Sequence, residues 1–293
     1  MNLNQMQSAV AVAKFGRFSA AADSLYISQS SLSQQIIALE KELGVKLFQR
    51  TTRDVQVTEA GAAFVEAASR ILREMDELGQ TMSAYAGMLK GTITIGTINA
   101  LEKIRFGQII TDFYLAYPNL NVDLSCQGSL SLLEALEKQT IDLAFLVRPE
   151  EPHPGIDYYP LGRDEYCLLV SRDHPLAERG CISLKEVASE RFIINQPSQT
   201  ISGIFMRACE KAGFVPNIIC RNSAAPIAMN LVKAGLGIAF MCGEEAETYR
   251  QEGVARLRLS DGIYKEIVMA VSGRREPSRL VQVFMDFVRS WKP

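Results

Sequence analysis

The stretch that decides the fold is SAAADSLYISQSSLSQQI, residues 19–36. It opens on alanines, and half of its residues are Ser or Gln. The alanines and Leu25 predict a short helix, for which Ser19 is a good N-cap and Phe18 a hydrophobic staple. A tight turn follows, and Ser28 is placed to cap a second helix. The stretch therefore predicts two helices joined by a turn.

The predicted second helix has one apolar face and one polar face. Four apolar side chains recur at helical spacing and predict the buried face: Leu32, Ile36, Leu39 and Leu43. The opposite face begins with short hydroxyl and amide groups and carries Ser30, Ser33, Gln34, Ile37 and Lys41. Such groups can form hydrogen bonds with base edges in the major groove. The two helices are typical of a DNA-binding helix-turn-helix, although a solvated face rich in Ser and Gln would have the same composition.

A candidate wing follows the second helix. Gly44 ends that helix, and LFQRTTRDVQVT, residues 47–58, predicts two short strands with a polar tip. Arginines on such a wing can hold the phosphate backbone or enter the minor groove. Residues 1–58 contain six basic and four acidic residues, so the prediction of DNA binding rests on pattern more than on charge. The predicted DNA contacts are Ser19, Gln29, Ser30, Ser31, Ser33, Gln34, Arg50 and Arg53.

Residues 18–61 resemble the N-terminal domain of LysR-type transcriptional regulators. The segment contains AA-x-x-L, SQ-x-x-x-S, LE-x-x-LG, LF-x-R and T-x-AG in the order and spacing of that family. The resemblance implies a winged helix-turn-helix over residues 1–58 and a linker helix that pairs between subunits. It also implies a two-lobed α/β effector domain similar to periplasmic solute-binding proteins, and hence a ligand-responsive, sequence-specific DNA-binding regulator.

Residues 59–90 predict a long helix with a coiled-coil seam, for which Thr58 is a good N-cap. Its apolar residues lie alternately four and three positions apart: Phe64, Ala68, Ile71, Met75, Leu78, Met82, Tyr85 and Leu89. A sustained alternation of this kind needs a second helix to bury it, which favours a homodimer. Packing onto the chain's own second domain is the alternative. A dimer would also place two copies of the winged helix-turn-helix, residues 1–58 (the reading head), on two half-sites of DNA.

From residue 91 to residue 293 short apolar runs alternate with helical stretches. The runs are TITIGT (92–97), NVDLSC (121–126), DLAFLV (142–147), YCLLVS (166–171), RFIIN (191–195), NIICRN (217–222), GIAFMC (237–242) and EIVMAVS (266–272). This alternation predicts an α/β domain with largely parallel, buried strands. The resemblance implies lobe I over 91–161 and 267–293, and lobe II over 162–266.

Small ligands in such folds bind at the carboxyl ends of strands. The residues at those ends are mostly hydroxyl and amide groups, which suit a small polar effector or a carboxylate. The predicted effector-binding residues are Thr97, Asn99, Ala100, Gly128, Ser129, Arg148, Gln196, Ser198, Thr200 and Ser223. For most of them an ordinary helix cap or turn is an equal alternative, and for Arg148 a surface ion pair.

The composition is that of an ordinary globular chain, with 47% hydrophobic and 22% charged residues and a formal net charge of −2. There is no apolar run of about eighteen residues, and the start MNLNQMQSAV lacks the basic and apolar parts of a secretory signal. We therefore expect a cytoplasmic protein without a membrane partner. The six cysteines lack zinc-site spacing and are expected to be free, buried thiols, with a redox-sensing pair left open.

An enzyme is disfavoured because the sequence has no G-x-S-x-G, H-E-x-x-H or Walker motif. We expect no cofactor and no metal. A solute-carrying binding protein is opposed by the lack of a signal peptide and by the predicted reading head. The expected partners are a double-stranded DNA operator, a small-molecule effector, further copies of the chain in a homodimer or homotetramer, and RNA polymerase in the case of an activator. The sequence does not distinguish activator from repressor.

Overall fold

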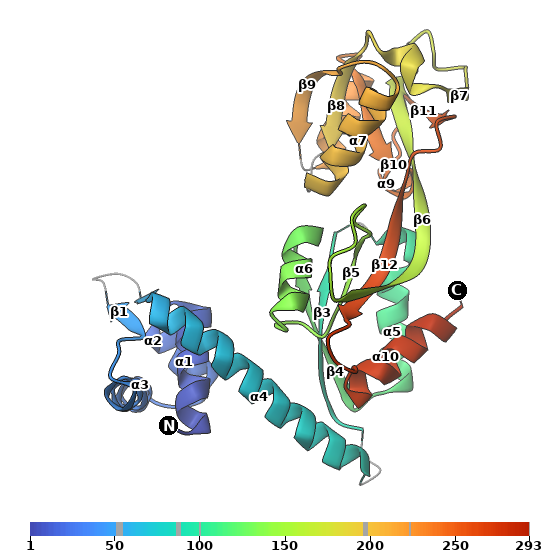
Figure 1. The fold of residues 1–293 in the computed structure, drawn as a ribbon. Coiled ribbons are helices and arrows are strands. Elements are labelled where there is room, and N and C mark those ends of the chain that lie inside the picture. Colours follow the sequence, from blue (N-terminus) through green and yellow to red (C-terminus); the bar gives the residue numbers. More distant parts are fainter. Residues whose placement is uncertain (51–54, 86–88, 100, 196–198, 223, 293) are drawn as a thin grey trace. The chain divides into compact units, whose positions relative to one another are not determined.

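The structure is a computed structural model that describes every residue except 51–54, 86–88, 100, 196–198, 223 and 293 (Figure 1). The chain folds as two units, the first built from Met1–Lys90 with Lys138–Thr140 and the second from Gly91–Glu137 and Ile141–Pro293. Among the described residues, none of the helices combines the length and the apolar character needed to cross a membrane.

The first unit is a small helical domain with a two-stranded wing. Its elements are α1 (Leu3–Phe15), α2 (Phe18–Ser24), α3 (Gln29–Leu43), β1 (Phe48–Arg50), β2 (Val55–Val57) and α4 (Glu59–Tyr85). The predicted helices and wing strands are confirmed, whereas the sequence patterns do not predict α1. Ala9, Ala21 and Ala22 are buried in the core of this domain. Their small side chains allow the first helices to pack closely.

The wing is tied to the start of α4. β1 and β2 pair antiparallel, with Phe48 opposite Val57. Gly61, in the first turn of α4, lies so close to the carbonyl group of Leu47 that a Cβ atom there would collide with it. The hydroxyl of Thr58 accepts a hydrogen bond from the Gly61 N–H at 2.9 Å, which confirms the predicted N-cap. The T-x-AG motif therefore joins wing and helix through one cap and one close approach.

The second unit is a mixed α/β domain. Its strands are β3 (Gly91–Thr97), β4 (Leu120–Cys126), β5 (Leu143–Val147), β6 (Ile156–Ser171), β7 (Cys181–Ile182), β8 (Arg191–Asn195), β9 (Asn217–Asn222), β10 (Ile238–Cys242), β11 (Val254–Leu259) and β12 (Tyr264–Ser272). Its helices are α5 (Phe106–Ala116), α6 (Ser129–Glu137), α7 (Gln199–Lys211), α8 (Ala225–Lys233), α9 (Gly243–Thr248) and α10 (Arg279–Ser290), with short 3-10 turns at Glu102–Ile104 and Leu184–Val187. Each predicted apolar run lies within a strand or extends at most one residue beyond it.

The strand order in the second unit is β4-β3-β5-β12-β6-β10-β8-β9. The outer strands pair parallel, β3 with β4 and β5, and β8 with β9 and β10. In the middle, β6 and β12 pair antiparallel with each other and with β10 and β5. The expectation of a largely parallel sheet is therefore wrong for the centre. Figure 1 shows the reason, because the chain leaves one lobe along β6 and returns along β12.

Each lobe has a hydrophobic core of its own. In lobe I, buried side chains of α6 pack on β5 and on the end of β12. In lobe II, two clusters cover the two faces of β8 and β10, and alternate residues of β6 point into one or the other. The lobes thus share a continuous strand pair, while each of these described clusters lies within one lobe.

Candidate DNA-binding surface and effector pocket

The first turn of α3 is an exposed and uncharged helix end. The hydroxyl of Ser28 accepts a hydrogen bond from the Ser31 N–H at 3.1 Å, which confirms the predicted cap. Ser30 and Gln34 are exposed, and Ser33 is half-buried. Because the helix N-terminus carries a partial positive charge, this surface can meet a phosphate while its side chains face bases.

The burial of α3 explains which face is left for a partner. Leu32, Ile36 and Leu39 are buried in the domain core, as the apolar stripe predicts. The prediction is wrong for Leu43, which is 37% exposed in the last turn. Gly44 ends the helix there in a left-handed conformation, with φ of 72°.

The predicted cap of α2 is also wrong. The helix begins at Phe18, and its N-cap position is Arg17, whose side chain makes no capping hydrogen bond. Phe18 is buried in the core and is not a staple outside the helix. Ser19 is exposed within the first turn of α2, so it stays a candidate DNA contact without being a cap.

Glu40 holds the start of the wing, a role that the sequence patterns do not predict. Its carboxylate accepts hydrogen bonds from the backbone N–H groups of Leu47 at 2.9 Å and Phe48 at 3.2 Å, and pairs with Lys46 at 2.6 Å. Burial would raise the pKa of Glu40, but these hydrogen bonds lower it below the usual value. The side chain of Arg50 and the whole of Arg53 lie outside the described residues, so the wing contacts stay predictions.

The seam of α4 divides into two parts. Phe64 and Ala68 pack within the first unit, Phe64 against the core cluster and Ala68 with only 2% of its surface exposed. Ile71, Met75, Leu78 and Met82 are instead 41%, 47%, 61% and 53% exposed. The described part of α4 runs to Tyr85, whose side chain lies outside the described residues, and Leu89 follows after the described helix. An unburied apolar stripe on one helix is the surface that a second copy could cover.

The predicted effector residues of lobe I lie at strand ends, as expected. Thr97 is buried and its hydroxyl donates to the Ser125 carbonyl at 3.4 Å, while the Asn99 side chain accepts a hydrogen bond from the Cys126 thiol at 2.8 Å. Ser129 begins α6 beside Gly128, is buried, and accepts a hydrogen bond from the Val147 N–H at 3.4 Å. Ala100, Gln196, Ser198, Ser223 and the side chain of Thr200 fall outside the described residues.

A pocket of about 790 Å³ joins residues of both lobes. It brings together Ser129 and Arg148 of the predicted set, the face of α7 around Arg207, and the crossing segment before and along β12. Arg148 pairs with Glu266 at 3.1 Å, as the alternative of an ion pair predicts. Both residues line the pocket, so the Arg148 guanidinium lies at its wall. Ligand pockets usually have volumes of about 300–1,000 Å³, so a small molecule fits.

A buried ion pair fixes the crossing strands next to this pocket. Lys265 on β12 lies opposite Asp164 on β6, their side chains are 1% and 4% exposed, and Nζ lies 3.5 Å from Oδ2. Burial would lower the pKa of Lys265, but the nearby Cys242 thiol and Asp164 carboxylate raise it. Removing either partner would leave a buried charge alone, which is strongly destabilising.

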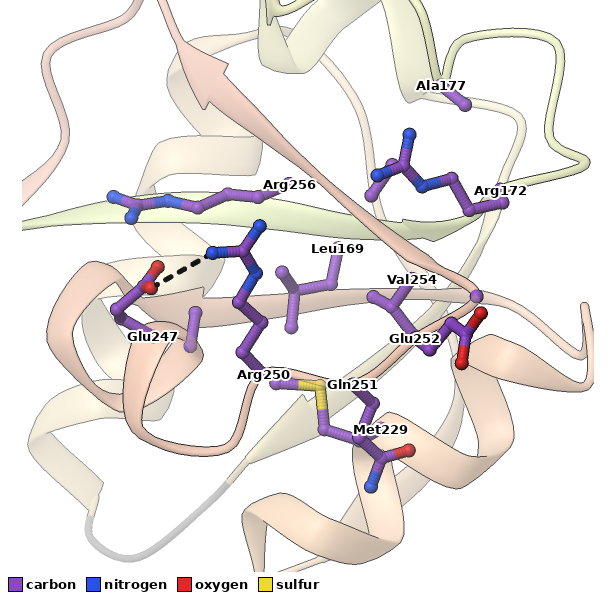
Figure 2. Close-up of a pocket in the computed structure, with 13 residues that line it drawn as sticks. Leu169, Arg172, Ala177, Met229, Glu247, Arg250, Gln251, Glu252, Val254 and Arg256 are labelled. Carbon is purple, nitrogen blue, oxygen red and sulfur yellow. Dashed lines mark hydrogen bonds and ion pairs between the residues drawn. The ribbon is translucent and has the colours of Figure 1, made fainter.

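A second pocket, of about 600 Å³, lies entirely within lobe II between α8, α9 and β11 (Figure 2). Its walls combine apolar residues such as Leu169 and Met229 with the charged Arg172, Arg250 and Arg256. Figure 2 shows Arg250 directed toward Glu247, with which it forms a 3.5 Å ion pair. None of the residues predicted from the sequence lines this pocket.

The cysteines are all free, but only half are buried. Cys167, Cys209 and Cys242 are buried, and burial raises the pKa of Cys167 to about 11 and of Cys209 to about 12. Cys126 and Cys181 are exposed, contrary to the expectation of buried thiols. Within the part of the chain that the structure describes, His, Cys, Asp and Glu form no group able to hold a metal ion.

Two family models match the two parts of the chain. Residues 3–62 match the bacterial regulatory helix-turn-helix protein family of the lysR type, and residues 86–293 match the LysR substrate binding domain. The chain belongs to the LysR family. It is a ligand-responsive, DNA-binding transcriptional regulator, and its second unit is the effector-binding domain. The predicted family, fold class and function are thereby confirmed.

Individual relatives agree with this assignment. The chain is 31% identical over 262 residues to the uncharacterized HTH-type transcriptional regulator YybE of Bacillus subtilis, covering 89% of this chain and 88% of YybE. It is 31% identical over 241 residues to the dual regulator OxyR of Escherichia coli, covering 82% and 79%. These relatives are transcriptional regulators and not enzymes.

Solved structures show the same fold over the whole length. Full-length BenM is 27% identical, with a TM-score of 0.60 and coverage of 99% of this chain and 96% of BenM. The LysR-family regulator CbnR in complex with its target DNA is 24% identical, with a TM-score of 0.70 and coverage of 99% of both chains. The second likeness bears on the fold alone.

Proposed function

We propose that the first two turns of α3 read the operator and that two chains, paired through α4, present two such helix ends to successive half-sites. The observation that carries the proposal is the uncharged helix end behind the Ser28 cap, formed by the exposed Ser30 and Gln34 and the half-buried Ser33. Hydroxyl and amide groups suit base edges, and the helix terminus suits a phosphate. Ser19, Gln29, Ser31, Arg50 and Arg53 complete the proposed contact set.

The experiment is a mobility shift with DNA fragments from upstream of the chain's own gene. The wild-type protein should shift one fragment specifically, with an affinity that falls steeply as salt rises. Gln34→Glu changes only one amide to a carboxylate and should abolish the shift. Ser290→Glu, at an exposed position of α10 in the other unit, is the control for an added charge. Failure to shift any upstream fragment at low salt would contradict the proposal.

Pairing through α4 is supported by the exposed stripe of Ile71, Met75, Leu78 and Met82. Single chains rarely leave such a continuous apolar stripe in water. Phe64 and Ala68, at the start of the same seam, pack inside the first unit and so anchor α4 to it. A regulator that acts on DNA in this way would work in the cytoplasm, and an activator would also contact RNA polymerase.

A homotetramer is supported by the edges of the effector domain. The edge strands are β4 and β9, at the two ends of the strand order. Large apolar side chains are exposed on or beside both edges: Tyr114 and Leu124 near β4, and Val215, Ile219 and Ile227 near β9. Edge strands with exposed apolar side chains are prone to pair with another chain. Light scattering of the wild-type protein should give the mass of four chains.

The proposed effector site is the 790 Å³ pocket that joins the two lobes. Ser129 and Arg148 line it, and Thr97, Asn99, Ala100, Gly128, Gln196, Ser198, Thr200 and Ser223 are proposed from their places at strand ends. Occupation of this site should change operator affinity, and by linkage the operator should change effector affinity by the same factor.

A further inference from the structure

One ion pair in the effector pocket links the two lobes directly. Arg207, on α7 of lobe II, pairs with Glu150, in the segment after β5 of lobe I, with Nη2 and Oε1 2.7 Å apart. Both residues line the 790 Å³ pocket. The Glu150 side chain is 62% exposed and lies outside any helix or strand, so little structure holds it in place.

Arg207 is positioned by α7 itself and not only by Glu150. Its guanidinium folds back over Gly203, where a Cβ atom would come within 3.0 Å of Nη1. Its Nε atom is buried and has no hydrogen-bond acceptor among the described residues, and the hydroxyl of Ser202, on the same helix, is likewise buried without a partner there. A buried donor without an acceptor is costly, so one further oxygen acceptor for the Arg207 Nε–H group would be stabilising.

The other carboxylates of the pocket are already engaged. Glu266 pairs with Arg148 at 3.1 Å and with Arg163 at 3.4 Å, and its side chain is only 18% exposed. Asp261 accepts a hydrogen bond from the Leu184 N–H at 2.8 Å and caps the short turn there. Glu150 is therefore the carboxylate that can leave its partner at least cost.

We propose that Glu150 occupies the place of the effector's own carboxylate on Arg207, and that the effector is a small organic carboxylate that displaces it. This inference rests on the proposed effector pocket. A ligand carboxylate can bind the guanidinium fork through two oxygens and so supply an acceptor to Nε as well. The exchange is cheap because an exposed ion pair contributes little to stability. Arg207 then recognises the carboxylate of the effector, and competition from Glu150 lowers the affinity for that carboxylate.

The test measures binding of acetate, succinate and benzoate, each paired with its uncharged amide, to the full-length protein by calorimetry. At least one carboxylate should bind the wild-type protein, and its amide should not. Glu150→Gln should raise the affinity for that carboxylate about two- to fivefold, the range that loss of an exposed ion pair allows. Arg207→Gln should lower it at least tenfold, as expected for loss of a charge-assisted bidentate contact.

The matched control is Glu244→Gln. Glu244 forms a different ion pair between the lobes, with Lys103 at 3.1 Å, outside the residues that line the pocket. Its loss should leave carboxylate affinity unchanged. If Glu150→Gln and Glu244→Gln raise affinity equally, the effect is a general loosening of the lobes and the inference is wrong. It is also wrong if none of the three carboxylates binds, or if Arg207→Gln or Glu150→Gln leaves affinity unchanged.

The same variants are assayed for operator binding, so that two failures can be told apart. Operator binding without any carboxylate binding would overturn only the inference about Glu150 and Arg207. If the wild-type protein does not bind the operator at all, the proposed function itself is wrong. Circular dichroism of each variant confirms that it is folded.

Discussion

Replacing Ser30 by Asp should separate the stability of α3 from its function. Ser30 is exposed in the first turn of the helix, close to the Ser28 cap. A negative charge in the first turn interacts favourably with the helix dipole, by about 0.3–1 kcal/mol at low ionic strength. The melting temperature should therefore stay the same or rise. A loss of DNA binding could then not be ascribed to unfolding of the reading head.

The same charge should weaken operator binding strongly. Two like charges about 4 Å apart repel by roughly 1 kcal/mol in water and roughly 4 kcal/mol at an effective dielectric constant of about 20. With one such clash per reading head, a dimer loses at least about 2 kcal/mol, or roughly a thirtyfold drop in affinity. The assay is fluorescence anisotropy on a labelled operator at low salt, with thermal unfolding followed in parallel. Ser290→Asp, at the exposed end of α10, controls for net charge. A Ser30→Asp protein that binds the operator as tightly as Ser290→Asp would refute the assignment of α3 as the reading helix.

Three further outcomes are expected. Leu78→Glu, at the most exposed of the described seam positions of α4, should reduce the mass found by light scattering by half without lowering the melting temperature of the reading head; an unchanged mass would exclude α4 as the interface. Leu32→Ala empties a fully buried position and should cost about 2–5 kcal/mol in the free energy of unfolding by urea. Because the native pKa of Glu40 is lowered, its carboxylate should stabilise the first unit fully above the usual pKa of 4.5 and lose that effect as the pH falls through the lowered value. Glu40→Gln should remove this part of the pH dependence, and an identical pH profile for wild type and variant would contradict the role given to Glu40.

The sequence predicts those parts of the fold that depend on local chemistry. Ser28 and Thr58 act as caps and Gly44 ends α3, because each of these needs only a few neighbouring residues. The apolar runs become strands for the same reason. The prediction for Ser19 fails because Phe18 is buried in the core and belongs to α2, which begins two residues earlier than the predicted cap would allow. Tertiary packing there overrides a good local cap.

Features that join distant segments could not be predicted from local pattern. The antiparallel pairing of β6 with β12 depends on how the chain returns between lobes, and the first half of β6 has no apolar run to reveal it. The roles of Glu40 and Arg207 arise from partners elsewhere in the chain. Charged residues of this kind look like ordinary surface positions in a sequence. Only the fold shows which backbone group or pocket they face.

The most direct test of the whole account is a DNase I footprint of the wild-type protein on its own upstream region. Paired chains with two α3 helices should protect two half-sites on one face of the duplex, with centres about one helical turn or a multiple of it apart. Both half-sites should lose protection together in Leu78→Glu. A single protected half-site that persists unchanged in Leu78→Glu would contradict the claim that two chains read DNA as a pair.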